Sequence, residues 1–415
     1  MASHTLRHPG APAPREVHLL AGTRPEAVKI APVVLSMRRH GRLRPVIVAS
    51  GQHPAMVHQA LDAFGLKPDE VLPVNRASGT QPELLAQVLP KLDALWRCRP
   101  PAAVLVHGDT TTTFAGALVA FWNRLPIVHL EAGLRSHNLS APFPEEANRR
   151  LVSIVAELHL APTPAAAGHL VDEGVPKART VVTGNTVVDA VHTVAARNHP
   201  FADPRLADLE NHARAGRNRV VLVTVHRRES WGAPLERVLR ALRILVRTHP
   251  DMVIVLPAHP NPDVRAQIHA ALNGIDRVVV TEPLGYSDLV RTLAMSVLVL
   301  SDSGGLQEEA PSFAVPVLVL RDVTERREAI EAGCAVLVGT DENRILDAAR
   351  AVLAEPPGLR ATNGGNPFGD GQAARRCEQA IAHLLGLDTE APEEFGAPIR
   401  ISAGDLGRGL RPART

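Results

Sequence analysis

The sequence predicts an α/β protein built from two Rossmann-like domains. Short runs of Val, Ile and Leu alternate with segments of helical spacing, which is the pattern of parallel α/β sheets. The alternation stops in a polar stretch near residue 200 and then starts again. A chain of 415 residues is also long for one hydrophobic core, since single cores stop growing near ~250–300 residues.

Short apolar runs mark the predicted strands of each domain. Those of the first domain lie at residues 17–20, 46–49, 103–106, 127–130 and 181–183. Those of the second domain lie at residues 220–225, 253–256, 278–281, 297–300 and 315–320. Because continuous Val, Ile and Leu runs are typical of strands that are buried on both faces, we expect parallel sheets covered by helices.

Proline, glycine and polar residues predict the domain boundaries. We expect an N-terminal domain at residues 15–197, which ends in a helix, and a C-terminal domain at residues 219–370. The polar residues 198–218 contain His-Pro and Asp-Pro steps and are the predicted linker. The remaining segments are a terminal helix at 371–387 and flexible ends at 1–14 and 388–415.

Composition and charge argue against several classes of protein. With 45% hydrophobic and 21% charged residues the chain can bury sizeable cores, which argues against extensive disorder. Its 45 basic and 43 acidic side chains give a net charge of +2, which favours neither nucleic acid nor membrane partners. The apolar runs are too short to cross a bilayer, and the polar N-terminus does not indicate export. Cys98, Cys334 and Cys377 are far apart, as in reduced cytosolic proteins, so we expect a soluble cytoplasmic protein.

The chemically informative residues follow the predicted strands, where ligands bind in open parallel sheets. After the first strand, Thr23, Pro25 and Glu26 form a plausible helix cap, which is the simpler interpretation. Arg24 and Lys29 go beyond capping, because cations at a helix start can bind an anion. The segment is neither a GxGxxG motif nor a P-loop, and the chain has no zinc-type cysteine pattern. No dinucleotide, ATP or metal cofactor is therefore predicted.

Two carboxylates follow the next central strands. Asp109 precedes four threonines and could cap a helix, but a carboxylate at a strand end can also act as a general base. Glu131 ends a buried strand, where an ionised group is costly unless it has a partner. A structural salt bridge from Glu131 to Arg135 or Arg149 is the alternative to a catalytic role.

A third carboxylate lies at the start of the following helix. Glu145 and Glu146 both open this helix, where acidic residues favour the helix dipole. Carboxylates on successive strand ends of one domain would also suit proton transfer at a substrate carbon. Structural and catalytic interpretations both remain open at this point.

The second domain carries cations and small residues after its strands. His226 is followed by Arg227 and Arg228, which favours contact with an anion or phosphate. His259 also follows a strand, where a turn is as good an interpretation as a site. The segment 301–310 has small residues that let a phosphate approach backbone N–H groups, and glutamates that could bind ribose. Together these strand ends predict a phosphate-sugar ligand between two domains.

These segments together resemble the bacterial UDP-N-acetylglucosamine 2-epimerases of the non-hydrolysing type. The matching strings are GTRPEAVKIAPVV, VHGDTTTTFAGALVAF, HLEAGLRS, APFPEEANRRL, TGNTVVDAV, VTVHRRE, SDSGGLQEEAPS and RDVTERREAIEAG. They occur in the family's order from about residue 18 to 385. The resemblance implies a GT-B fold, with two Rossmann-like domains, an active-site cleft between them and a C-terminal helix that crosses back to the first domain.

The resemblance also assigns roles. It implies that proton-handling groups are Asp109, Glu131 and Glu145, with His226 beside them. The groups implied to bind UDP are Arg24, Ser303, Gly304 and Gly305 for phosphate, with Lys29 in support, and Glu309 for ribose. No metal or cofactor is implied.

The implied reaction interconverts UDP-N-acetylglucosamine and UDP-N-acetylmannosamine by inversion at C2. UDP is eliminated to give a 2-acetamidoglucal and is then added back. The product could feed a cell-wall polymer, a capsule or a specialised metabolite, and a homodimer is expected. The alternatives are a hydrolysing epimerase that releases UDP and free N-acetylmannosamine, a GT-B glycosyltransferase, and a UDP-sugar-binding pseudoenzyme.

The sequence departs from the family at several positions. Arg327 stands where the family usually has Pro, and Leu289 stands where an aromatic residue often lies near uracil. Many bacterial members have a second, regulatory nucleotide site, at which Ala55 and Ser78 replace polar or basic residues. The candidates that remain at this regulatory site are Gln52, His53 and His259. We therefore expect weak or absent activation by UDP-N-acetylglucosamine.

Overall fold

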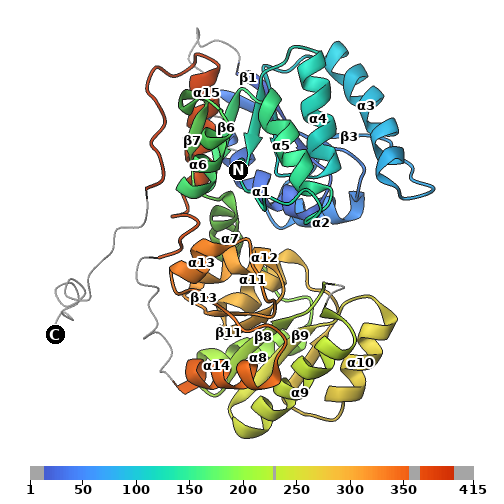
Figure 1. Ribbon diagram of the computed structural model, residues 1–415, viewed down its shortest axis with the longest axis vertical. Coiled ribbons are helices and arrows are strands. Elements are labelled where there is room, and N and C mark those ends of the chain that lie inside the picture. Colours follow the sequence, from blue (N-terminus) through green and yellow to red (C-terminus); the bar gives the residue numbers. More distant parts are fainter. Residues whose placement is uncertain (1–13, 228–229, 355–364, 397–415) are drawn as a thin grey trace, which may run out of the picture. The chain divides into compact units, whose positions relative to one another are not determined.

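The computed structural model describes residues 14–227, 230–354 and 365–396, which belong to two compact units (Figure 1). Unit 1 contains the chain up to Thr186 together with Gln372–Glu394. Unit 2 contains Val187–Gly371 and the residues from Phe395 onward. Each unit has its own sheet with parallel pairing, which confirms the α/β class and the two Rossmann-like repeats of strand and helix.

Unit 1 is built on a seven-stranded sheet in the order β3-β2-β1-β4-β5-β6-β7. Its strands are β1 (Arg15–Ala21), β2 (Leu43–Ala49), β3 (Glu70–Val71), β4 (Ala103–His107), β5 (Ile127–Leu130), β6 (Leu158–Ala161) and β7 (Thr180–Val182). Its helices are α1 (Arg24–His40), α2 (Pro54–Asp62), α3 (Gln81–Cys98), α4 (Thr111–Trp122), α5 (Glu145–Val155), α6 (Pro164–Asp172) and α15 (Ala373–Leu384). Val17, Leu19 and Ala21 on β1 have no exposed surface, because a central parallel strand is covered on both faces.

Unit 2 is built on a six-stranded sheet in the order β10-β9-β8-β11-β12-β13. Its strands are β8 (Arg219–Thr224), β9 (Met252–Pro257), β10 (Val278–Thr281), β11 (Ser296–Ser301), β12 (Val317–Val319) and β13 (Ala335–Leu337). Its helices are α8 (Pro204–Arg214), α9 (Ala233–Thr248), α10 (Pro262–Leu272), α11 (Tyr286–Ala294), α12 (Gly304–Glu309), α13 (Arg327–Glu331) and α14 (Glu342–Ala354). The helix α7 (Thr186–Arg197) begins where the two units divide.

The strand order reverses at one point in each sheet. In unit 1 this point lies between β1 and β4, and in unit 2 it lies between β8 and β11. Connections leave these neighbouring strands in opposite directions and open a crevice at their carboxyl ends, where α/β proteins bind ligands. The loops after these strands are therefore the places to look for a site.

The helix α15 belongs to unit 1 although it follows unit 2 in the sequence. The Arg42 guanidinium donates two hydrogen bonds to Glu378 of α15, at 2.7 and 2.8 Å, and a further one to Asp388 at 2.8 Å. The Glu378 side chain has no exposed surface, so this ion pair anchors the helix beside the end of α1. The Asp388 contact shows that the described start of the segment 388–415, which we expected to be flexible, is packed on unit 1. Residues 1–13 and 397–415 lie outside the described residues.

The segment 198–218, which composition predicts to be a linker, contains the helix α8. Asp203 accepts a hydrogen bond from the backbone N–H of Arg205 at 3.0 Å, and Pro204 is the first helical residue. The Asp-Pro step is therefore an N-cap followed by a favourable first residue, rather than a turn in a linker. Leu206 of α8 is fully buried in the core of unit 2, so the division between units lies earlier, after Thr186.

Two buried histidines lie side by side in the sheet of unit 1. His129 of β5 pairs in register with His159 of β6, and their rings are 6.3 Å apart. Burial lowers the pKa of His129 to about 3 and that of His159 to about 4, and nearby positive charge adds to the effect. Both rings are therefore neutral in the folded protein across the physiological range.

We predict that the protein loses stability as the pH falls from about 7 toward 5. In the unfolded chain both histidines bind protons with the ordinary histidine pKa of about 6.5, whereas in the folded chain they stay neutral at this pH. The free energy of unfolding therefore falls with decreasing pH, by at most about 1.4 kcal/mol per pH unit for each histidine. The measurement is the thermal midpoint of His129→Gln against pH, which should fall less steeply than that of the wild type. The exposed His58→Gln is the control, and equal slopes for His129→Gln and wild type would contradict the prediction.

Candidate functional site

A buried carboxylate joins the ends of β1 and β4 in unit 1. Glu26 of α1 is 1% exposed and accepts hydrogen bonds from the backbone N–H groups of Gly22 and Thr23, at 2.9 and 2.7 Å. It also accepts from the hydroxyls of Thr110 and Thr113, at 2.6 and 3.0 Å. The threonine run therefore does more than cap α4, because it satisfies a buried charge and fixes the loop that begins α1.

Glu131 lies directly after β5, in contact with three groups from different elements. Its carboxylate forms an ion pair with Lys29 of α1, lies 3.3 Å from Asn185 Nδ2, and lies 3.4 Å from His107 Nε2. The backbone φ of Glu131 is 60°, a left-handed conformation that costs about 1–2 kcal/mol for a residue with a side chain. Such strain is concentrated at functional sites, which makes Glu131 a candidate for a functional role.

The arginines expected as partners of Glu131 have other partners. Arg135 donates two hydrogen bonds to Glu173, at 2.9 and 2.7 Å. Arg149 forms an ion pair with Asp109, and the backbone oxygen of Asp109 accepts a hydrogen bond from Asn148 at 2.8 Å. Glu131 thus forms a salt bridge, as the structural alternative predicts, but its partner is Lys29 and neither Arg135 nor Arg149.

The two glutamates that open α5 have different environments. Glu146 has no exposed surface and accepts hydrogen bonds from the backbone N–H groups of Ser136 and His137, at 2.9 and 3.2 Å. Glu145 is only half-buried, and no hydrogen bond to its carboxylate is found within the described residues. Glu146 therefore holds the loop before α5, whereas Glu145 keeps a carboxylate available for a ligand.

In unit 2 a buried aspartate joins the ends of β11 and β8. Asp302 is fully buried and accepts hydrogen bonds from the backbone N–H groups of His226 and Arg227 and from the Ser230 hydroxyl, at 2.9–3.1 Å. His226 Nδ1 lies 2.6 Å from the same carboxylate. Burial raises the pKa of Asp302, but its hydrogen bonds with His226 and the backbone N–H groups outweigh burial and lower it below its usual range. The ionised aspartate accepts a hydrogen bond from the Nδ1–H group of His226. The other ring nitrogen, Nε2, is left for a ligand, and the ring is half-exposed.

The segment after β11 brings small residues close to charged ones. A Cβ at Gly304 would lie 3.3 Å from Glu325 and 3.4 Å from the Arg326 guanidinium, so a larger side chain has little room there. Arg326 and Arg321 lower the pKa of Glu325 to about 2, although burial alone would raise it. Gly305 follows Gly304 in α12, and Ser303 is the residue before this helix. The loop is therefore small, polar and surrounded by fixed charges.

The remaining candidates in unit 2 lie along α11 to α13. Glu309 is 7% exposed and accepts a hydrogen bond from the Tyr286 hydroxyl at 3.3 Å. Leu289 packs against the hydrophobic core of the unit, which explains an aliphatic residue at this position. Arg327 is the first residue of α13, where proline is also well tolerated, so its departure from the family pattern leaves the helix start intact.

The residues assigned to a regulatory site lie in both units. Gln52 accepts a hydrogen bond from the Thr112 hydroxyl at 2.8 Å. A Cβ placed on Gly22 would lie 2.1 Å from the same hydroxyl oxygen, so a larger residue would clash there. His53 is exposed and precedes α2. His259 of unit 2 lies against the Trp231 ring, with 5.3 Å between ring centroids.

Arg24, a candidate for phosphate binding, is the first residue of α1 and is half-buried.

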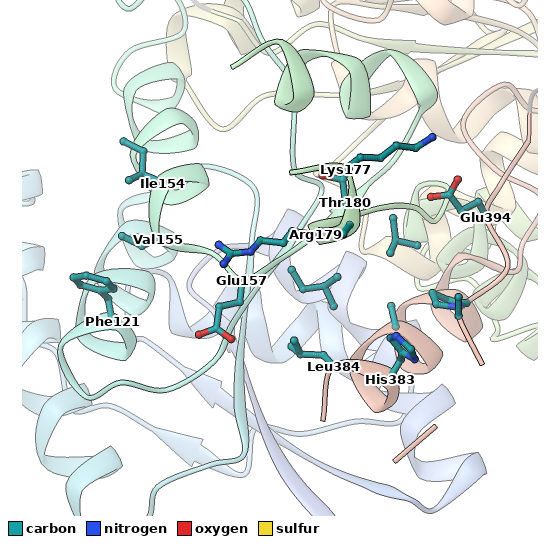
Figure 2. A pocket seen from close by; sticks show the side chains of 16 residues that line it. Phe121, Ile154, Val155, Glu157, Lys177, Arg179, Thr180, His383, Leu384 and Glu394 are labelled. Atoms are coloured by element: carbon teal, nitrogen blue, oxygen red, sulfur yellow. The ribbon is translucent and has the colours of Figure 1, made fainter. Parts of the chain in front are cut away.

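A hollow of about 650 Å³ lies elsewhere on unit 1 and contains none of the candidate residues. Figure 2 shows Phe121, Ile154 and Val155 along one side of it and His383 and Leu384 of α15 on the other. Lys177, Arg179, Glu157 and Glu394 contribute balanced charges to its wall. Its size alone does not make it an active site, because it is remote from the strand ends where the unusual residues gather.

Neither His107 nor Asp302 was singled out from the sequence, and Arg149 was considered only as a partner of Glu131. His107, Arg149 and Asp302 occur within the quoted motifs, but nothing in a linear sequence indicates which charge each one meets. No cluster of His, Cys, Asp or Glu suited to a metal occurs within the residues that the structure describes. None of the helices in these same ranges combines the length and the apolar character of a membrane span.

Comparison with known proteins connects this geometry to one family. The family model for UDP-N-acetylglucosamine 2-epimerase matches residues 35–382. The Bacillus subtilis UDP-N-acetylglucosamine 2-epimerase is 41% identical, with 92% of this chain and 98% of the relative covered. The UDP co-structure of S. aureus MnaA is 40% identical and has a TM-score of 0.81, with 92% of this chain and 100% of that chain covered. The UDP-GlcNAc 2-epimerase from Neisseria meningitidis bound to UDP-GlcNAc is 37% identical with a TM-score of 0.79, with 90% and 100% covered. The fold is thus the GT-B fold of these proteins.

We predict that Asp302→Asn loosens the loop after β8. Hydrogen bonds to a charged acceptor contribute about 1.5–3 kcal/mol each, so losing the charge should raise amide exchange at residues 226–227 by about tenfold or more. Hydrogen-exchange mass spectrometry of this loop measures the change. Asp251→Asn is the matched control, because Asp251 pairs with Arg219 at the other end of β8. Unchanged exchange in Asp302→Asn would show that the loop is held by other contacts.

Proposed function

The chain belongs to the UDP-N-acetylglucosamine 2-epimerase family, and we propose that it interconverts UDP-N-acetylglucosamine and UDP-N-acetylmannosamine without hydrolysis. A base removes the C2 proton while the bond between C1 and the UDP oxygen breaks, which gives a 2-acetamidoglucal and UDP. UDP then adds back to C1, and C2 is protonated from the opposite face. The products differ only in the configuration at C2.

The observation that carries this proposal is the distinct environment of the three carboxylates of unit 1. Asp109 is paired with Arg149, Glu131 with Lys29, and Glu145 has no hydrogen-bond partner within the described residues. Removing a proton from one face and adding one to the other requires two proton positions with different properties. We propose that Asp109, Glu131 and Glu145 supply them.

Unit 2 supplies the groups for the leaving diphosphate. A C2 proton is weakly acidic, so charge on the leaving group must be stabilised by fixed donors. We propose that His226, oriented by Asp302, and the Ser303-Gly304-Gly305 segment bind the diphosphate together with Arg24. Glu309 binds the ribose hydroxyls. Lys29 contacts Glu131, so we assign its main role to holding that carboxylate.

We predict that Asp109→Asn, Glu131→Gln and Glu145→Gln each reduce kcat by about 10²–10⁴-fold, the usual contribution of a positioned acid or base. The assay is nuclear magnetic resonance of UDP-N-acetylglucosamine incubated with each variant. UDP-binding affinity, measured by calorimetry, should change much less than kcat.

The exposed Glu157→Gln of the same unit is the control and should keep wild-type turnover. If one of the three variants keeps a near-wild-type kcat, the carboxylate that it replaces has a structural role only. Release of UDP and free N-acetylmannosamine by the wild type would identify a hydrolysing epimerase. Transfer to an acceptor would identify a glycosyltransferase, and binding without turnover a pseudoenzyme.

We also propose that the protein is a homodimer. Phe121 and Trp122 of α4 and Leu151 and Ile154 of α5 are 47–78% exposed, on two helices that pack together. Large exposed apolar side chains grouped in this way are typical of protein–protein interfaces. Phe121 and Ile154 also line the hollow in Figure 2. The apolar surface therefore includes a depression into which side chains of a second copy can pack.

We predict that Ile154→Asp shifts the protein from dimer to monomer, because it places a charge in this apolar surface. Sedimentation velocity over a concentration series should show at least about a tenfold weaker dimer, equivalent to about 1.4 kcal/mol. Val171→Asp is the control, since Val171 is 45% exposed on α6 outside the apolar surface. A wild-type protein that stays monomeric throughout the series contradicts the proposal.

The other assignments stay predictions. The cytoplasmic location is one of them, and burial raises the pKa of Cys334 to about 11, which makes its thiol unreactive. The second nucleotide site at Gln52, His53 and His259 also stays a prediction. Arg76, two residues before Ser78, already donates to the backbone oxygen of Gly79 in its own loop, which supports weak activation.

A further inference from the structure

His107 is a buried histidine for which the proposed reaction has so far no use. It is the last residue of β4 and is 4% exposed. Its Nε2 lies 3.4 Å from the Glu131 carboxylate and has no hydrogen-bond partner within the described residues. A buried nitrogen without a partner is uncommon, because no hydrogen bond compensates for the water that it has lost.

The other contacts of Glu131 explain why this nitrogen matters. Lys29 Nζ and Asn185 Nδ2 are donors, so both favour the ionised carboxylate over the protonated acid. A neutral imidazole nitrogen differs from them, because it can accept a proton from a carboxyl group and give it back. Among these three contacts, His107 is therefore the one suited to proton exchange with Glu131.

The proposed reaction needs such an exchange. Glu131 lies next to an ammonium group, so a proton taken from the sugar is held there unfavourably. Water is largely excluded from a carboxylate that is 8% exposed, so solvent has limited access to remove or replace that proton. A buried base at 3.4 Å offers a shorter route.

We propose that His107 stores the proton that Glu131 handles, an inference that rests on the proposed function. The proton leaves the Glu131 carboxyl oxygen and binds the lone pair at His107 Nε2, which gives a carboxylate and an imidazolium. When epimerisation runs in the reverse direction, transfer of the proton from His107 back to Glu131 restores the acid that protonates C2 from the side of Glu131. His107 thus acts through Glu131 and does not contact the substrate.

The charges around His107 are compatible with this role. Glu131 favours the imidazolium, and Lys29, which pairs with Glu131, opposes it. His129 on β5 is near enough to interact electrostatically with His107, but its lowered pKa keeps it neutral. Asp109, two residues further along the chain, is already paired with Arg149.

The test compares His107→Gln with His18→Gln. Glutamine keeps a polar side chain of similar reach but cannot carry a proton at neutral pH. His18 is a matched control, because it is also buried in this sheet with Nε2 beside a carboxylate, Glu16, at 2.8 Å. We expect His107→Gln to reduce kcat by about 10²-fold with little change in KM, and to remove one limb of the dependence of kcat on pH. His18→Gln should keep the wild-type kcat and pH profile.

The outcomes separate this inference from the proposed function. A wild-type kcat and pH profile in His107→Gln, together with an inactive Glu131→Gln, would overturn the role of His107 and leave the proposed function intact. An active Glu131→Gln would instead remove the role of Glu131 on which the inference rests.

A second measurement does not require His107→Gln to fold. Nuclear magnetic resonance of ¹⁵N-labelled histidine gives the titration midpoint of His107 in the wild type and in Glu131→Gln. We expect a lower midpoint in Glu131→Gln, because the neutral amide no longer stabilises the imidazolium. An unchanged midpoint would show that the two groups are not coupled and would overturn the inference.

Discussion

A buried carboxylate at the point where the strand order reverses holds the loops of each unit in place. Glu26 ties the loop after β1 to the threonines after β4, and Asp302 ties the loop after β8 to the end of β11. Both are at most 1% exposed, and each is surrounded by backbone N–H and hydroxyl donors that offset the cost of burying a charge. Arg24, Asp109 and His226 lie in or directly beside these loops, so their positions depend on the two carboxylates.

The carboxylates that we assign to chemistry are held differently from these two structural ones. Glu26 and Asp302 meet several hydrogen-bond donors, whereas Glu131 meets a lysine and also a histidine, whose neutral imidazole can exchange a proton with it. Asp109 is paired with an arginine, a cation that does not exchange its proton. The partners of each carboxylate are therefore the reason why we assign a structural role to Glu26 and Asp302 and propose proton transfer for Glu131.

The sequence is a good guide to the fold because buried parallel strands are continuous apolar runs. The run at 220–225, for example, corresponds to β8. The strand β6 was not recognised, because His159 interrupts its short apolar sequence, and α8 was missed because its capping Asp-Pro step looks like a turn. The candidate site residues were chosen because they follow predicted strands, but their pairings could not be predicted in this way. Lys29 and Glu131 are 102 residues apart in sequence, and only the fold brings them into contact.

The central claim is that inversion proceeds by removal and replacement of the C2 proton. The most direct measurement is proton nuclear magnetic resonance of UDP-N-acetylglucosamine incubated with the protein in deuterated water. We expect deuterium at C2 of both UDP-sugars, because C2 is protonated from the opposite face by a group other than the base that removed its proton, and in deuterated water that group carries a deuteron. Epimerised product without deuterium at C2 would contradict the elimination and re-addition of UDP.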